Sequence, residues 1–195
     1  MTHRTGPTLG TVGDLATWVP VLLVVALVAG WYLSFTASRI DRLHHRVESS
    51  RAALDAQLAR RAGLAVELAP RVGDPQGPAL AAAASAALTP SGDLTEIAQS
   101  SLTRALADAL AEPDDVHRLR REALADQLLT QLSEAVARSQ MARRFHNDAV
   151  AQTQRVRRKW VVRAARLAGR AAWPQMVEID DRLPPGLTEG QSRVP

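Results

Sequence analysis

Residues 15–38 read LATWVPVLLVVALVAGWYLSFTAS, without one charged side chain, and residues 39–69 follow directly as RIDRLHHRVESSRAALDAQLARRAGLAVELA. At ~1.5 Å per residue, the apolar run is long enough to cross a hydrocarbon core of ~30 Å. The second run has no helix breaker before Pro70, and its apolar residues recur near one helical face. These residues are Ile40, Leu43, Val47, Leu54, Leu58, Ala65 and Leu68. The pattern predicts one long helix whose first half lies in a membrane and whose second half projects from it.

The ends of the apolar run favour an uncleaved anchor. Trp18 lies near one end and Trp31, Tyr32 and Phe35 near the other, as in the aromatic belts of membrane-spanning helices. A secretory signal peptide is one alternative, but the run is long and no clean small-residue cleavage site follows it. A fully buried helix of a soluble protein is the other alternative, although few soluble helices are apolar on all sides.

The basic residues that flank the run predict its orientation. Arg4 is the only Lys or Arg on the N-terminal side, whereas Arg39, Arg42, Arg46 and Arg51 follow the run closely. Under the positive-inside rule, we expect a single-pass protein of the cell membrane with its N-terminus outside and its C-terminal body in the cytoplasm.

Composition favours an all-α body. Aromatic residues are 4% of the 195 residues, cysteine is absent, and alanine and leucine supply much of the apolar content. We expect a transmembrane helix that continues into an antiparallel three- or four-helix bundle. The expected divisions are a flexible tail at 1–14, the membrane helix at 15–38, the helical domain at 39–173 and a C-terminal tail at 174–195 that is ordered only where it docks. Helix breakers at 70–78, 89–92 and 112–113 separate shorter helices from a last long helix at about 116–162. The expected core residues of that helix are Leu119, Leu124, Leu128, Leu132, Val136, Phe145, Ala149 and Val156.

Two motifs resemble those of the LemA family. The run RVESSRAALDAQLARRAGLAVEL at 46–68 is similar to the family's RVE element followed by D-x-Q-L-x-R-R and an aliphatic segment. ARRFHNDAV at 142–150 is similar to its A-R-x-x-Y-N-x-A-V, with His146 in place of the tyrosine. The closing LAGRAAWPQMVEID resembles the family's glycine and aromatic segment that leads to an acidic end. The resemblance implies a membrane-anchored antiparallel bundle with a cytoplasmic body, and it implies no catalytic activity.

The sequence offers no signature of an enzyme, a cofactor site or a metal site. Nucleotide-binding glycine motifs and the nucleophile elbow G-x-S-x-G are absent, and the five histidines include no H-E-x-x-H and no pair at i, i+4. We therefore expect no catalytic residue, no cofactor and no metal.

One polar constellation is expected to fix the register of the helices. Arg143 and Asn147 share a helix face at i, i+4 and are predicted to meet acidic or amide side chains of the first helix, because packed polar groups need partners. A ligand site at the same place is the alternative. The residues of this network are Glu48, Asp55, Gln57, Arg60, Arg61, Arg143 and Asn147.

A basic segment lies at 138–170, where Asp148 is the only acid among ten Lys and Arg residues. If the last helix returns toward the membrane, its end would contact anionic lipid at ~1 kcal/mol per basic residue. A solvated helix face and nucleic-acid binding are the alternatives. The candidate lipid-binding residues are Arg155, Arg157, Arg158, Lys159, Trp160, Arg163, Arg166 and Arg170.

The sequence thus predicts a non-enzymatic membrane-anchored scaffold that docks partner proteins or the inner leaflet. A regulatory module that supports a membrane protease or a two-component system is one alternative, and a nucleic-acid tether is another. Homo-oligomerisation is also open, because alanine-rich helix faces bury little area each.

Overall fold

The fold is all-helical, as predicted. The computed structural model describes residues 11–89, 94–165, 167, 169 and 171–188, and every regular element in these ranges is a helix. Asp93, which stands three residues before Glu96 as in a helix capping box, lies outside these ranges. In order, the elements are α1 (Thr11–Leu68), the 3₁₀ turn η1 (Ala69–Arg71), α2 (Gln76–Leu88), α3 (Leu94–Ala109), α4 (Pro113–Arg121), α5 (Ala123–Arg157), α6 (Trp160–Ala164) and α7 (Pro185–Thr188).

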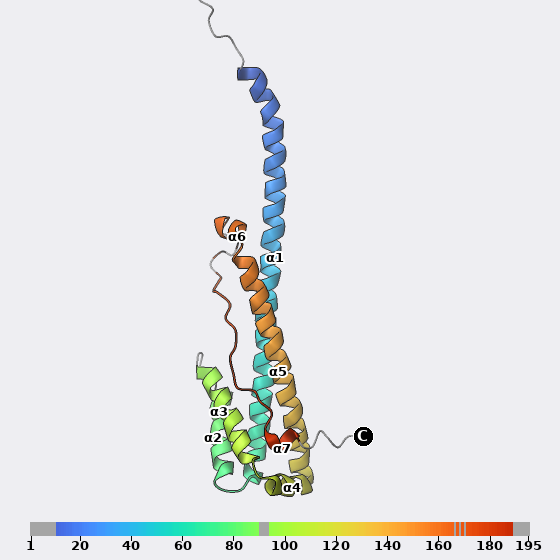
Figure 1. Ribbon diagram of the computed structural model, residues 1–195, viewed down its shortest axis with the longest axis vertical. Helices are drawn as coiled ribbons and strands as arrows, with labels where there is room; N and C mark the ends of the chain where they lie inside the picture. Colours follow the sequence, from blue (N-terminus) through green and yellow to red (C-terminus); the bar gives the residue numbers. More distant parts are fainter. Residues whose placement is uncertain (1–10, 90–93, 166, 168, 170, 189–195) are drawn as a thin grey trace, which may run out of the picture.

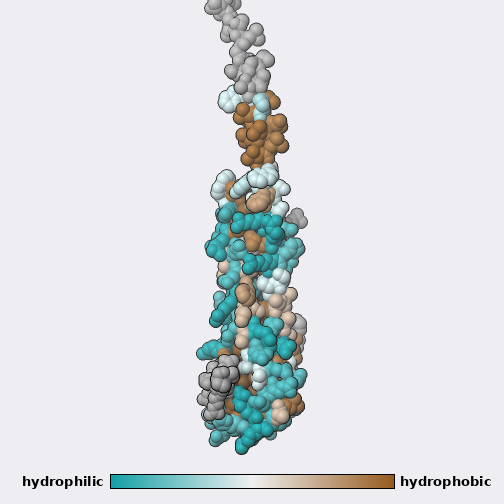
Figure 2. All heavy atoms as spheres, turned by 90° about the vertical axis from the view of Figure 1, so that its right-hand side faces the viewer, coloured by the Kyte–Doolittle hydropathy of each residue, from teal (hydrophilic) through white to brown (hydrophobic). Residues whose placement is uncertain are grey.

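Helix α1 spans 58 residues, and its two halves differ in their surroundings. It begins at Thr11, inside the stretch expected to be a flexible tail. Its upper half stands clear of the rest of the molecule (Figure 1), and Figure 2 shows this half as an apolar band above a largely hydrophilic body. Within the described residues, α1 is the one helix long and apolar enough to cross a membrane, and none of its most apolar part is buried.

The lower half of α1 packs antiparallel to α5. Near the apolar band, Ile40 and Leu43 cluster with Val156, and at the far end Leu64 and Leu68 share a core with Leu128 and Leu132. Helices α2 and α3 pack on the lower part of α1, and α4 lies across the end of the molecule (Figure 1). The predicted core of this part of α1 is confirmed except for Val47, which is half-buried.

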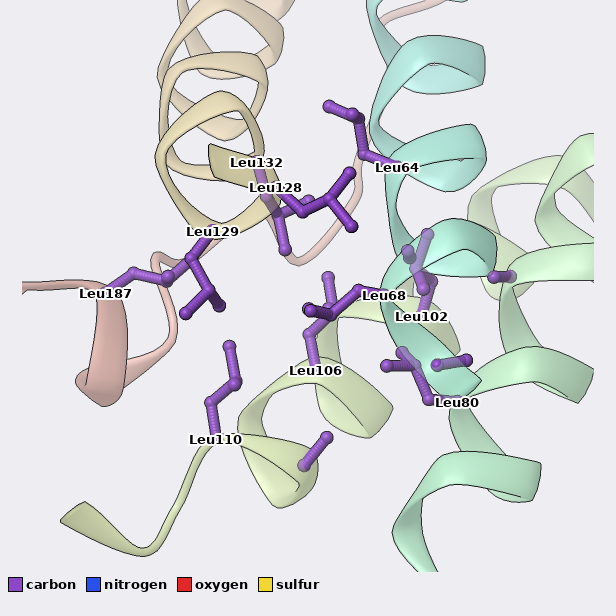
Figure 3. Packing of buried hydrophobic residues seen from close by; sticks show 14 of the residues in the cluster. Leu64, Leu68, Leu80, Leu102, Leu106, Leu110, Leu128, Leu129, Leu132 and Leu187 are labelled. Carbon is purple, nitrogen blue, oxygen red and sulfur yellow. The ribbon is translucent and has the colours of Figure 1, made fainter. Parts of the chain in front are cut away.

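The main core lies at the far end, where leucines of α1, α2, α3, α4, α5 and α7 belong to one buried cluster, part of which Figure 3 shows. No buried cluster includes a residue before Ile40, so residues 39–195 retain the whole of the described core. Two of the labelled leucines come from α1, one from α2, two from α3, three from α5 and one from α7. They are Leu64, Leu68, Leu80, Leu102, Leu106, Leu128, Leu129, Leu132 and Leu187, and the tenth labelled leucine, Leu110, directly follows α3.

The expected single helix at 116–162 is wrong, because the chain bends at two places. Glu122 has extended backbone angles, so α4 turns across the core and buries Val116 and Leu119. Lys159 is also extended and separates α5 from α6. Two expected core residues of this region, Leu124 and Phe145, are exposed. The α5 face toward α1 instead uses small residues such as Ala135 and Ala149, which allow close helix approach.

Candidate functional site

Residues 171–184, which we call the strap, form no helix and run along α5 from the α6 end of the molecule toward α7 (Figure 1). Side chains of α5 hold the main chain of the strap along its length. Asn147 donates to the Val177 carbonyl at 3.1 Å and accepts from the Val177 N–H at 2.9 Å. Gln140 donates to the carbonyl of Asp181, Gln154 to that of Pro174, and Arg157 to those of Ala171 and Ala172.

Helix α3 holds the same strap through three side chains on one helical face. Glu96 accepts from the N–H of Glu178, Ser100 accepts from the N–H of Asp180 at 3.1 Å, and the Thr103 hydroxyl donates to the carbonyl of Asp180. The described part of the predicted C-terminal tail, residues 174–188, is thus docked on the body and continues into α7.

Arg143 and Arg61 interact in different ways with the carboxylate of Asp181. Arg143 grips it with two charge-assisted hydrogen bonds, Nε to Oδ2 at 2.7 Å and Nη2 to Oδ1 at 3.1 Å. Among the described residues Arg61 forms no ion pair, and the negative charges of Asp181 and Asp180 stabilise its guanidinium at longer range. The strap thus brings negative charge to a part of the body that contains a buried cation.

Arg61 is the most deeply buried charged residue described, with 1% of its surface exposed. Its guanidinium donates to the Gln99 carbonyl and side-chain oxygen, both at 2.8 Å, and to Thr103 Oγ1 at 3.1 Å. Gln99 in turn donates to the carbonyl of Ala87, so the network joins α1, α3 and α2. Burial lowers the pKa of Arg61 to about 10, against the effect of Asp181 and Asp180, so the group stays charged at neutral pH.

The partners predicted for the polar network are therefore wrong for Arg143 and Asn147. Arg143 and Asn147 bond to the strap rather than to the first helix. The other members do not join them, because they lie on other faces of α1. Glu48 is exposed beside His45, Asp55 pairs with Arg51 on its own helix, Gln57 lines a shallow hollow beside Phe145, and Arg60 is exposed.

Sequence reasoning singled out Arg143, Asn147 and Arg157 for other roles and missed Gln140 and Gln154, although a signal for the whole set exists. Five polar residues of α5 fall at spacings of three, four, seven and three, which places them on one helical face. A second such stripe on α3 bonds to the same segment. Two polar stripes beside an apolar core indicate that a non-helical segment lies between α3 and α5, since its main-chain N–H and carbonyl groups need hydrogen-bond partners. The α5 stripe consists of Gln140, Arg143, Asn147, Gln154 and Arg157.

His146 occupies the position where the LemA-like motif has tyrosine, and it is buried between α5 and α1. Its Nδ1 lies 3.1 Å from the Ser50 hydroxyl, and its Nε2 has no partner. The pKa of His146 lies below its usual 6.5, chiefly because burial disfavours the charged ring. Arg51 lowers the pKa further, while the nearby backbone of Gln175 and Val47 and the carboxylate of Asp55 oppose the shift.

We expect the stability of the body to fall as the pH drops below about 6.5, because the unfolded chain then binds a proton that folded His146 resists. Chemical unfolding of residues 39–195 at several pH values from about 7 to 5 measures this slope. His146→Gln should flatten it, whereas His45→Gln, at an exposed histidine, should leave it unchanged. Equal slopes for all three proteins would contradict the account.

The basic end of the molecule, which we define as residues 155–163, lies next to the base of the apolar half of α1. Val156 and Val162 form a buried cluster with Ile40 and Leu43, only a few residues after the apolar run ends at Ser38. Figure 1 shows α6 at this level, beside α1. The return of the C-terminal helical region toward the apolar run is thus present in the structure.

The candidate lipid-binding residues differ in their exposure and in their contacts with the strap. Arg155, Arg158, Lys159, Trp160 and Arg163 are exposed, Trp160 to 77%. Arg157 instead holds the strap, and both it and Arg158 stack on the Trp173 ring, at 5.0 and 6.0 Å from its centroid. Arg166 and Arg170 lie outside the described residues.

Comparison with family models found no match, and searches against curated proteins and solved structures found none either. Within the described residues, no group of three or more His, Cys, Asp or Glu side chains could hold a metal ion.

Proposed function

We propose that this protein is a non-enzymatic, LemA-like scaffold with a single membrane-spanning helix at 15–38. The body then stands on the cytoplasmic side with its basic end against the anionic headgroups of the inner leaflet. The observation that carries the proposal is that the exposed basic end lies beside the end of the apolar run. The buried cluster of Ile40, Leu43, Val156 and Val162 holds these two parts together.

The surfaces on the two sides of this junction support a membrane setting. Above it, the large apolar side chains from Trp18 to Phe35 are mostly exposed. Exposure of this apolar surface to water costs free energy, and the hydrocarbon core of a bilayer would remove that cost. Below it, the exposed Arg and Lys side chains supply the charge that anionic lipid attracts. The rings of Trp31 and Phe35 stack at 6.2 Å near the junction, where amphipathic and aromatic side chains favour the headgroup level.

The body itself favours a structural role over a catalytic one. The polar residues of α3 and α5 that are best placed for chemistry bond instead to the strap, and Arg61 bonds to Gln99 and Thr103. A body built in this way offers rigid surfaces at a distance from the membrane. We propose that those surfaces dock partner proteins.

The orientation is tested by reporters fused after residue 195. We expect a C-terminal reporter that works only in the cytoplasm to be active, and one that works only outside to be silent, because the basic residues follow the apolar run. The same reporters fused in front of residue 1 serve as the matched control and should give the opposite result. Activity of the outside reporter at the C-terminus would reverse the proposed topology.

A further inference from the structure

We infer that the side chains that hold residues 177–181 of the strap form a recognition site for an extended acidic segment of a partner protein. The strap is the intramolecular occupant of that site. We call this set of side chains the strap site. It comprises Glu96, Ser100 and Thr103 of α3 and Gln140, Arg143 and Asn147 of α5. The inference deepens the proposed scaffold role, on which it rests, because it names what the body docks.

Most of the contacts in the strap site do not depend on the sequence of the occupant. Asn147 bonds both main-chain groups of Val177, much as a neighbouring β-strand would. The other main-chain contacts reach Glu178, Asp180 and Asp181 from both helices. Protein modules that bind extended peptides use main-chain hydrogen bonds for affinity and side-chain pockets for specificity. The strap site supplies such main-chain hydrogen bonds.

Three side chains of the strap supply the specificity. Val177 and Ile179 are buried in one cluster with Leu54 and Leu58 of α1. Two residues further on, the Asp181 carboxylate meets Arg143. Alternate residues of an extended chain point the same way, so the site selects an apolar residue, a second apolar residue two positions later, and an aspartate two positions after that.

The charges indicate that the occupant must be acidic. Arg61 is buried without a carboxylate in contact, and its Nε has no hydrogen-bond partner. Asp180 and Asp181 supply the nearest compensating charge. If the strap left and nothing replaced it, buried Arg61 would lose this compensation, which is costly for a buried charge, and half-buried Arg143 would lose its ion pair. An incoming segment therefore needs a carboxylate at the position of Asp181.

The strap also explains why the site is closed in the isolated chain. A segment on the same chain competes at an effective concentration in the millimolar range, without any new contact. Arg157 of the basic end holds the first residues of the strap, through hydrogen bonds to the Ala171 and Ala172 carbonyls and through contact with the Trp173 ring. A partner segment must bind more tightly than the strap, or the strap must first be loosened.

The test uses the full chain in detergent micelles and a fluorescent peptide with the sequence of residues 173–188, WPQMVEIDDRLPPGLT. Two chain variants weaken the strap by different means without altering the strap site. Asp181→Asn removes the ion pair, and the double variant Val177→Ala with Ile179→Ala removes the apolar anchors. Circular dichroism identifies the variants that keep their helices, and fluorescence anisotropy measures peptide binding.

We expect both opened chains to bind the peptide at least ten times more tightly than the wild type. A peptide in which the residue corresponding to Asp181 is asparagine should bind the opened chains at least ten times more weakly. Arg143→Gln, added to the Val177→Ala, Ile179→Ala chain, should abolish the difference between the two peptides, as a double-mutant cycle requires of a direct pair.

Equal binding of the two peptides, or no binding to folded opened chains at millimolar peptide, would overturn the inference. Dimers of an opened chain that the peptide dissociates would also overturn it, because the occupant would then be a second copy of this chain. None of these results would alter contact of the basic end with lipid, so failure here is distinguishable from failure of the proposed membrane role.

Discussion

Arg61→Ala is expected to lower the free energy of unfolding of residues 39–195 by about 3 kcal/mol or more, because it leaves buried polar partners unpaired and opens a cavity. Gln99 would lose two hydrogen bonds and Thr103 one, in a region that water does not reach. Chemical denaturation followed by circular dichroism measures the change.

Arg60→Ala is the matched control for this prediction. Arg60 is the neighbouring residue of the same helix, has the same side chain and is exposed, so its loss should change the free energy of unfolding by no more than about 0.5 kcal/mol. A similar effect of the two substitutions would show that burial of Arg61 does not stabilise the body.

The second large effect concerns lipid. Replacing Arg155, Arg158, Lys159 and Arg163 together by glutamine should weaken the binding of residues 39–195 to anionic vesicles by a factor on the order of 10² to 10³, since each basic residue near the surface contributes ~1 kcal/mol. Arg157 is left in place because it holds the strap. Vesicle co-sedimentation over a range of anionic lipid content measures binding, which should also weaken with added salt.

A control with the same change of charge separates position from net charge. Arg60, Arg104, Arg121 and Arg144 are also exposed, but they lie elsewhere on the body. Their replacement by glutamine should reduce vesicle binding far less than the first set does. If the wild-type body ignores anionic vesicles at low salt, the basic end is only a solvated surface.

The features that could be predicted from the sequence follow from periodicity along single helices. The apolar face of α1 from Ile40 to Leu68 was predictable because one repeating pattern governs it, and so were Leu128 and Leu132 of α5. Phe145 was misplaced because hydrophobicity alone predicts burial, whereas the seam between α1 and α5 admits small side chains such as Ala142 and Ala149.

The strap could not be predicted in the same way, because its contacts are not periodic within one element. They join main-chain groups of an irregular segment to side chains located tens of residues earlier, such as Asn147 to Val177 and Ser100 to Asp180. The sequence did predict that Arg61, Arg143 and Asn147 need polar partners. It did not identify those partners, since α3 and the strap were not expected to contribute them.

The central claim is that the basic end lies at the membrane surface, and one labelling measurement tests it most directly. The chain has no cysteine, so Ala164→Cys at the exposed end of α6 and Thr130→Cys near the far end of α5 can each carry one environment-sensitive fluorophore. With the full chain in proteoliposomes, quenchers attached to lipid headgroups should strongly quench the label at 164 and leave the label at 130 unaffected. Equal and weak quenching at the two positions would contradict the account.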